Sequence, residues 1–251
     1  NAILSLFAVT LGAGAAGTLN MWYESDLDAL MSRTCLRPIP SGIINKKQAL
    51  IFGVITSFVS VGILYIFSNL TSALILTITI LFYVLIYTVW LKRKTPQNIV
   101  IGGAAGALPP VIGWTIATGS ITFEPIVLFL IIFFWTPSHF WALSLYKTED
   151  YKKAKIPMLP VTSGIKITKL NVFVYSLILC PIVILPFILS YFGLIYLVFS
   201  SILSIYYVYL CYKLLSENDA VKEKKVAKKI FIFSIFHLFG IFTLILLDKF
   251  I

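Results

Sequence analysis

Eight apolar segments, each long enough to cross a lipid bilayer, constrain this 251-residue chain more than any other feature. Within a bilayer only helices and closed barrels satisfy the polar groups of the backbone, and segments of this length are typical of helices. We therefore expect an all-α polytopic membrane protein, with residues 1–251 forming a single transmembrane domain. The segments lie at roughly 2–22, 48–68, 72–91, 98–118, 124–146, 170–190, 193–213 and 229–247.

The basic residues indicate how these segments are threaded through the membrane. Every Lys and Arg except Lys249 falls in the first, third, fifth or seventh connection. The positive-inside rule makes those connections cytoplasmic, as in a bacterial inner or plasma membrane. The net charge of +10 is therefore a topology signal, and we expect a lipid bilayer rather than a nucleic acid as the partner of this chain.

A cluster of polar residues follows the first apolar segment. If that helix continues past Trp22, then Asn20, Glu24 and Asp28 lie on one face at roughly 6 Å per step, and Asp26 points elsewhere. One amide and two carboxylates are hard oxygen ligands of the kind that Mg²⁺ prefers, often together with phosphate oxygens. The alternative is a solvated helix end whose acids pair with nearby arginines, and this cluster by itself does not separate the two readings.

Basic side chains near this cluster suit an anionic substrate. Arg33 and Arg37 follow it, and guanidinium groups bind phosphate or carboxylate through paired hydrogen bonds. Lys92 and Arg93 end the third segment on the same side of the membrane. They would neutralise a departing diphosphate, although topology alone also explains them.

A second polar cluster lies at the cytoplasmic end of the fifth segment. His139, Tyr146 and Asp150 are spaced by seven and four residues, so a continuous helix would place them on one face, with Lys147 beside them. A single histidine on an apolar helix is about as often a hydrogen-bonded core residue as a ligand. Two polar clusters that open to the same side favour a diphosphate site.

Small residues within the segments predict close helix packing. "GAGAAG" at residues 12–17 matches the dinucleotide-binding pattern GxGxxG, but it lies inside an apolar segment with no strand before it. We interpret it as a helix-packing surface, as we do the pair Gly102 and Gly106.

Three long stretches resemble the UbiA-type intramembrane prenyltransferases and, within that family, the haem O synthase (protohaem IX farnesyltransferase) branch. Asn20, Glu24 and Asp28 match the family motif NxxxDxxxD, with Glu in the first acidic position. The stretches similar to the branch are "NMWYESDLDALMSRTCLRPIPSG", "YTVWLKRKTPQNIVIGGAAGALPPVIGW" and "TPSHFWALSLYKTEDYKKAKIPMLPV". The family has nine spans, so the resemblance implies that the first is missing from this sequence, which begins at Asn1 inside an apolar run.

The resemblance implies an Mg²⁺-dependent transfer of the farnesyl group of farnesyl diphosphate to a vinyl group of protohaem (haem B), with addition of water, giving haem O and diphosphate. Haem is then a substrate rather than a cofactor, and haem-oxidase assembly proteins are candidate partners. The candidate catalytic residues are Asn20, Glu24, Asp28, His139, Tyr146 and Asp150, with Asn20, Glu24, Asp28 and Asp150 as metal ligands. The candidate substrate-binding residues are Arg33, Arg37, Lys92, Arg93 and Lys147, the two arginines before residue 40 serving either the diphosphate or the haem propionates.

Two departures from the family pattern bear on these assignments. Ser25 stands where the branch often has Arg, and Ala154 follows Asp150 where the family's second motif, DxxxD, has an acid. Two other functions stay open: a UbiA-type enzyme with another aromatic or tetrapyrrole acceptor, and a membrane transporter. The acids cluster at the ends of the segments rather than at mid-membrane, which disfavours the transporter.

Overall fold

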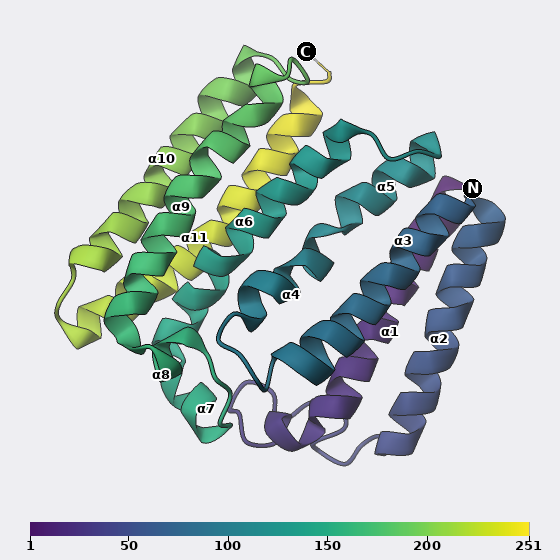
Figure 1. The fold of residues 1–251 in the computed structure, drawn as a ribbon, viewed down its shortest axis with the longest axis horizontal. Helices are drawn as coiled ribbons and strands as arrows, with labels where there is room; N and C mark the ends of the chain where they lie inside the picture. The colour runs from purple at the N-terminus through teal and green to yellow at the C-terminus, as the bar shows by residue number, and fades with distance from the viewer. Residues whose placement is uncertain (251) are drawn as a thin grey trace. The chain divides into compact units, whose positions relative to one another are not determined.

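The computed structural model describes residues 1–250, and all of its regular structure is helical (Figure 1). By length and composition, eight helical segments can cross a membrane, so the predicted fold class and number of spans are confirmed. The spans are α1 (Ala2–Asp28), α2 (Lys46–Phe67), α3 (Leu70–Leu81) with the π-helical η1 (Phe82–Leu91), α4 (Asn98–Ala107) with α5 (Pro109–Thr118), α6 (Phe123–Tyr146), α9 (Gly164–Ile188), α10 (Leu194–Ser216) and α11 (Ala220–Leu247). Two short helices, α7 (Thr148–Lys153) and α8 (Leu159–Thr162), precede α9.

The chain forms two compact units. The first consists of Asn1–Pro125 and Glu149–Pro157. The second consists of Ile126–Thr148 and the described residues from Met158 onward.

In the first unit, α1, α2 and α3 lie side by side (Figure 1). Gly12 and Gly53 permit this packing, because a Cβ on Gly12 would stand 2.9 Å from Leu76 Cδ1 and one on Gly53 would stand 2.8 Å from Leu19 Cγ. Gly102 in α4 lies close to the ring of Tyr87 in η1, where an added Cβ would meet Cδ2 at 2.2 Å. The helix-packing interpretation is confirmed for Gly12 and Gly102, whereas a Cβ on Gly14, Gly17 or Gly106 would meet no atom within 4 Å.

Two irregularities in the first unit shape its spans. The fourth span is interrupted at Leu108, and α5 begins with Pro109 at its first position, where the missing N–H of proline has no helical partner to lose. The third span changes to a π-helix at Phe82, and Lys92 N donates to Tyr87 O, five residues earlier. A π-helical stretch changes the direction in which the following side chains point.

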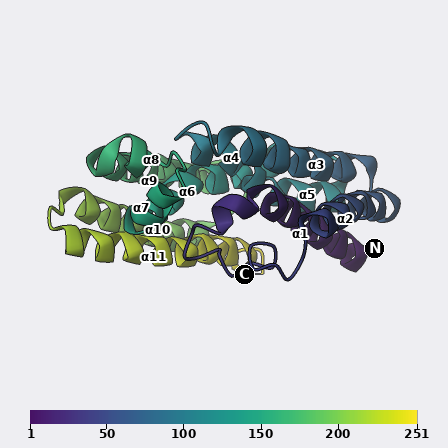
Figure 2. The ribbon, with the colours of Figure 1, turned by 90° about the horizontal axis from the view of Figure 1, so that it is seen from below.

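The second unit is a helix bundle in which α10 runs alongside both α9 and α11 (Figures 1 and 2). Side chains join α6 to its neighbours in this unit: Trp141 packs edge-on against Tyr175 of α9 with 5.3 Å between ring centroids, and Ser138 Oγ lies 2.8 Å from Tyr207 Oη of α10. Small polar groups are satisfied by such contacts between helices in the apolar part of a bundle.

The last span begins earlier than expected. The apolar segment lies at roughly 229–247, but α11 is helical from Ala220, where Asp219 caps it by accepting from Val221 N and Lys222 N. Its Glu223 is buried against Lys169 of α9, with 3.1 Å between Oε2 and Nζ. A carboxylate this close to a buried ammonium is part of the packed bundle, which hydropathy along the chain does not reveal.

Candidate active site

One buried face of α1 carries the predicted polar cluster. Helix α1 continues to Asp28, and Asn20, Glu24 and Asp28 are only 6%, 1% and 4% exposed. Asn20 Nδ2 donates to Glu24 Oε2 at 2.9 Å. The predicted alignment of these three residues is therefore confirmed, whereas their catalytic role stays a prediction.

The π-helix η1 supplies the groups that face this cluster. Thr88 Oγ1 accepts from Asn20 Nδ2 at 3.0 Å, and Lys92 Nζ forms an ion pair with Glu24 Oε2. Thr88 in turn donates to Tyr83 O at 2.8 Å, five residues back, in the π-helical pattern. Thr88 could not be identified from the sequence, because a threonine inside an apolar span carries no signal of its own.

The loop after α1 folds back onto Asp28. Arg37 Nη1 lies 2.8 Å from Asp28 Oδ2, and the buried Thr34 donates from Oγ1 to Asp28 O at 2.9 Å. The Arg37 side chain keeps 34% of its surface exposed, so it reaches the buried carboxylate from the solvent side. An ion pair with this geometry holds the loop in place and keeps a guanidinium beside the site.

Asp26 points away from this face, as predicted, and binds Arg93 in a fork of two hydrogen bonds of 2.9 and 3.1 Å. The guanidinium also lies over the ring of Tyr23, 4.9 Å from its centroid. Burial lowers the pKa of Arg93, but the hydrogen bond and negative charge of Asp26 outweigh it, so the pKa lies above its ordinary value. Arg93 therefore belongs to an exposed pair beside the buried cluster. Arg33, the remaining arginine predicted to bind substrate, is exposed as well.

The second polar cluster is divided by a helix end. α6 stops at Tyr146 and α7 begins at Thr148, so the expectation that His139, Tyr146 and Asp150 share one continuous helical face is wrong. Asp150 belongs to the first unit, where it accepts from Ser32 Oγ at 2.6 Å, next to the loop that carries Arg37. Hydropathy does not reveal this helix end, because the apolar run stops near Tyr146 whether the helix ends there or continues.

His139, Tyr146 and Lys147 belong to the second unit. His139 Nδ1 lies 2.6 Å from Ser234 Oγ of α11, and the rings of both His139 and Tyr146 contact Phe231, at 4.7 and 5.9 Å between centroids. Lys147 is half-buried just after the end of α6. Two of the predicted residues thus do share a face of α6, directed at α11.

The oxygen ligands on α1 suit a hard cation. Among residues 1–250 no three His, Cys, Asp or Glu side chains gather as a metal site, and Asp150 is bonded to Ser32. Glu24 nevertheless has one carboxylate oxygen, Oε1, that is buried without any hydrogen-bond partner. A buried, unpartnered carboxylate oxygen is costly unless a cation or donor reaches it. The donor set of Asn20, Glu24 and Asp28 therefore fits Mg²⁺.

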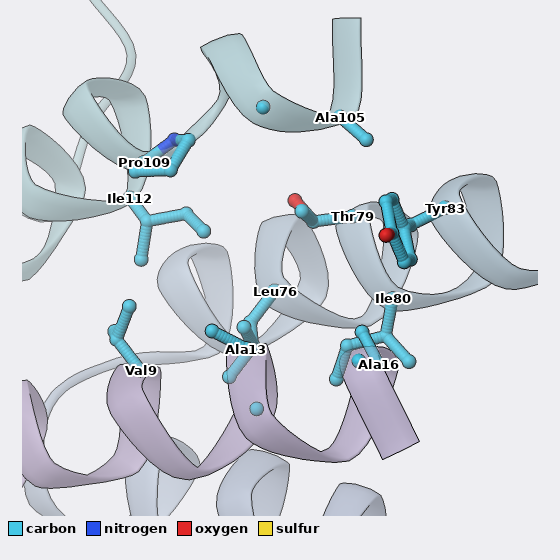
Figure 3. Close-up of a pocket in the computed structure, with 13 residues that line it drawn as sticks. Val9, Ala13, Ala16, Leu76, Thr79, Ile80, Tyr83, Ala105, Pro109 and Ile112 are labelled. Carbon is cyan, nitrogen blue, oxygen red and sulfur yellow. The ribbon is translucent and has the colours of Figure 1, made fainter. Parts of the chain in front are cut away.

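An apolar cavity of about 230 Å³ lies in the first unit, along the same helices that carry the polar cluster (Figure 3). Val9, Ala13 and Ala16 of α1 face Leu76, Thr79, Ile80 and Tyr83 across it, with Ala105, Pro109 and Ile112 closing it from α4 and α5 (Figure 3). From Ala16 to Glu24 is about 12 Å along α1 at the helical rise of ~1.5 Å per residue. The apolar cavity and the polar cluster thus follow one another along α1 and the α3–η1 span.

Comparison with known proteins places this arrangement in a family. The UbiA prenyltransferase family model matches residues 1–236, which is nearly the whole chain. The chain belongs to the UbiA prenyltransferase family. It is accordingly an integral, polytopic membrane protein, and the family resemblance stated from the sequence is confirmed.

Curated relatives of this UbiA-family chain are named as farnesyltransferases. A protein of Pelagibacter ubique (strain HTCC1062) named protoheme IX farnesyltransferase is 64% identical over 249 residues, covering 99% of this chain and 82% of the relative. Protoheme IX farnesyltransferase 2 of Mesorhizobium japonicum is 49% identical, covering 99% of this chain and 79% of the relative. The resemblance to the protohaem branch is therefore confirmed.

Solved structures of the family share the fold. A digeranylgeranylglyceryl phosphate synthase structure has a TM-score of 0.80 at 22% identity and covers 98% of this chain and 84% of its own. A UbiA homologue from Archaeoglobus fulgidus, bound to DMAPP and Mg²⁺, has a TM-score of 0.67 at 18% identity. The match covers 97% of this chain and 87% of the homologue. The apo structure of a UbiA homologue from Aeropyrum pernix K1 has a TM-score of 0.74 at 17% identity. The match covers 98% of this chain and 89% of the homologue.

Proposed function

We propose that this UbiA-family enzyme transfers the farnesyl group of farnesyl diphosphate to a vinyl group of protohaem, with addition of water, giving haem O and diphosphate. The acceptor is supported by the relatives named protoheme IX farnesyltransferase, at 64% and 49% identity over 99% of the chain. The donor is supported by one observation above all: the apolar cavity and the polar cluster follow one another along α1 and the α3–η1 span. That order matches a ligand with an apolar chain and an anionic end.

The cavity suits the farnesyl chain. Its walls are aliphatic or small, apart from Thr79 and the ring of Tyr83, so burial of an isoprenoid chain is favoured by the removal of apolar surface from water. Tyr83 lies at the end of the cavity that is next to η1, one π-turn before Thr88. An aromatic ring at this position would stabilise positive charge that develops on the allylic carbon.

The polar cluster suits the diphosphate. Asn20, Glu24 and Asp28 would hold Mg²⁺, with Asp150 as a further candidate ligand, and the bound ion supplies a counter-charge to the leaving diphosphate. Structures of an Archaeoglobus fulgidus homologue contain Mg²⁺ together with DMAPP or GPP, which supports this dependence. Lys92 forms an ion pair with Glu24, and Arg37 forms one with Asp28. When the diphosphate is bound, both side chains would also bind its oxygens.

The proposed chemistry balances without another reactant. The bond between farnesyl C1 and the diphosphate oxygen breaks, and the electron pair leaves with the diphosphate, whose charge Lys92 and Arg37 stabilise. The vinyl π electrons of protohaem form the new carbon–carbon bond to C1. Water then adds to the cation on the former vinyl carbon and loses a proton to solvent, leaving a hydroxyl group.

The distribution of basic residues supports placing this chemistry on the cytoplasmic side. Lys92, Arg93 and Arg37 lie in connections that carry nearly all of the Lys and Arg residues of the chain. The positive-inside rule assigns such connections to the cytoplasm. Farnesyl diphosphate and haem would then enter the site from that side.

Product analysis tests the proposal. Purified protein in nanodiscs is incubated with protohaem, farnesyl diphosphate and Mg²⁺, and the haem is analysed by mass spectrometry. We expect a farnesylated, hydrated haem that disappears with a chelator or with Asp28→Ala. Asp26→Asn is the matched control, because Asp26 lies on the opposite side of the same helix turn and should leave the product in place. Diphosphate release with another acceptor but not with protohaem would refute the proposed acceptor.

A variant that fills the cavity tests where the farnesyl chain of the substrate binds. Ala16 is 8% exposed and lines the cavity, so Ala16→Phe would occupy the space of the farnesyl chain. We expect KM for farnesyl diphosphate to rise by about tenfold or more, equivalent to ~1.4 kcal/mol of lost binding. Unchanged KM values for farnesyl and geranyl diphosphate would place the isoprenoid chain elsewhere.

A further inference from the structure

The imidazole of His139 is held on three sides in the second unit. Trp135 stacks on it at 4.2 Å between ring centroids, with 18° between the planes, and Phe231 stacks on it at 4.7 Å, with 27° between the planes. Two rings cannot occupy one face of a five-membered ring at such distances, so they cover opposite faces. Its Nδ1 edge is engaged by Ser234 Oγ at 2.6 Å.

A second hydrogen bond of Ser234 determines the tautomer of His139. Ser234 Oγ lies 2.7 Å from Phe231 O, and a carbonyl oxygen accepts but never donates, so the single hydroxyl proton of Ser234 points there. Ser234 Oγ can then only accept from His139. In the neutral imidazole the proton therefore lies on Nδ1, and Nε2 carries the free lone pair.

We infer that His139 ligates the iron of protohaem through Nε2 and that Ser234 is the positioning residue that fixes its tautomer and ring orientation. This inference rests on the proposed function, since the iron belongs to the proposed acceptor. Neutral imidazole with a hydrogen-bonded Nδ1–H is the usual protein ligand of haem iron. A ring fixed between Trp135 and Phe231 needs little further ordering when the ligand bond forms.

The other histidine of the chain lacks these properties. His237 is 0% exposed, stacks on Tyr207 at 5.0 Å between ring centroids and binds Ser204 Oγ through Nε2 at 3.1 Å. His139 retains 7% exposure, whereas His237 is fully buried. His237 is thus a core residue, and His237→Gln is a matched control for removal of a histidine from the same bundle.

The tautomer can be measured without haem. The chain has two histidines, so protein labelled with ¹⁵N-histidine gives two imidazole spin systems, and His237→Gln leaves that of His139 alone. We expect a protonated Nδ1 and a bare Nε2. Ser234→Ala should convert His139 to a mixture of tautomers, whereas a protonated Nε2 in the unmodified chain would overturn the inference.

Haem binding tests the ligand bond. The full chain in nanodiscs is titrated with protohaem and followed by absorption and by the iron–histidine stretching band of the ferrous complex in resonance Raman spectra. We expect the band in the unmodified protein and in His237→Gln, its loss in His139→Ala, and its return as an iron–imidazole band when imidazole is added to His139→Ala. Ser234→Ala should keep the band at a shifted frequency and bind haem about 10- to 100-fold more weakly.

The outcomes separate this inference from the proposed function. A band that persists in His139→Ala, or that is absent from the unmodified protein, overturns ligation by His139 even if farnesylated haem is formed. A His139-dependent band in a protein that releases no haem product supports ligation while refuting the proposed transfer. Loss of the band in His237→Gln, without loss in His139→Ala, would assign the ligand to the wrong histidine and overturn the inference.

Discussion

The ion pair between Glu24 and Lys92 predicts a large and asymmetric response to substitution. The carboxylate of Glu24 is 1% exposed, whereas the Lys92 side chain is 20% exposed. In Lys92→Met the hydrocarbon stem is kept and the charge removed, so the buried carboxylate loses its counter-ion. Breaking a buried pair from this side costs about 3–5 kcal/mol, because an uncompensated charge remains in the protein.

The reverse substitution should cost less. In Glu24→Gln the side-chain amide can still accept from Asn20, and Lys92, which is one-fifth exposed, can extend its ammonium group toward water. We expect a loss of about 1–3 kcal/mol, the range for a disrupted hydrogen bond to a charged group. The double variant Glu24→Gln with Lys92→Met should lose less than the sum, with a coupling energy on the order of 2 kcal/mol.

The free energy of unfolding in detergent, measured by denaturant titration, checks these values. Lys94→Met is the control, because Lys94 is exposed two residues further on and its substitution should change stability by only about 0.5 kcal/mol. If Lys92→Met and Lys94→Met were equally stable, Lys92 would not stabilise the buried carboxylate of Glu24, and the reasoning would be refuted. Additive losses in the double variant would likewise refute the direct pairing.

Four further substitutions should have graded effects on the free energy of unfolding, each measured in the same titration. Gly102→Ala should cost about 1–3 kcal/mol, because its Cβ would overlap an aromatic ring 2.2 Å away, whereas Gly106→Ala, with no atom within 4 Å, should be tolerated. Lys169→Met should cost about 3–5 kcal/mol, because it strands the buried Glu223. Arg93→Gln should cost under ~1 kcal/mol, because its ion pair is largely exposed. Equal losses for Arg93→Gln and Lys169→Met would contradict the role assigned to burial.

The apolar pattern was enough to predict the spans, because length and hydropathy are properties of the sequence alone. The alignment of Asn20, Glu24 and Asp28 was predictable for the same reason: four-residue spacing on a helix dictates a shared face. The helix end at Tyr146 was not predictable, since polar residues continue whether the helix turns or runs on. Asp150 therefore does not lie on one continuous helix with His139 and Tyr146, while its role as a ligand stays a prediction.

The partners of the acids also lay outside what local spacing can show. Lys92 was recognised as basic and near the membrane edge, but its pairing with Glu24, and the contact of Thr88 with Asn20, depend on residues 68 positions apart. The change to a π-helix at Phe82 determines the direction of these side chains, and no sequence pattern in residues 82–91 predicts a π-helix. Long-range pairing and helix register are decided by packing.

Sequence by itself thus determined the membrane class, the eight spans and the polar face of α1, because hydrophobicity and helical period act locally along the chain. Only the tertiary structure decided which base neutralises which acid, left Glu24 Oε1 without a partner and placed Ser234 against His139. Those features arise where side chains from different helices compete for the same buried space, and a buried polar group must find its partner there or remain unsatisfied.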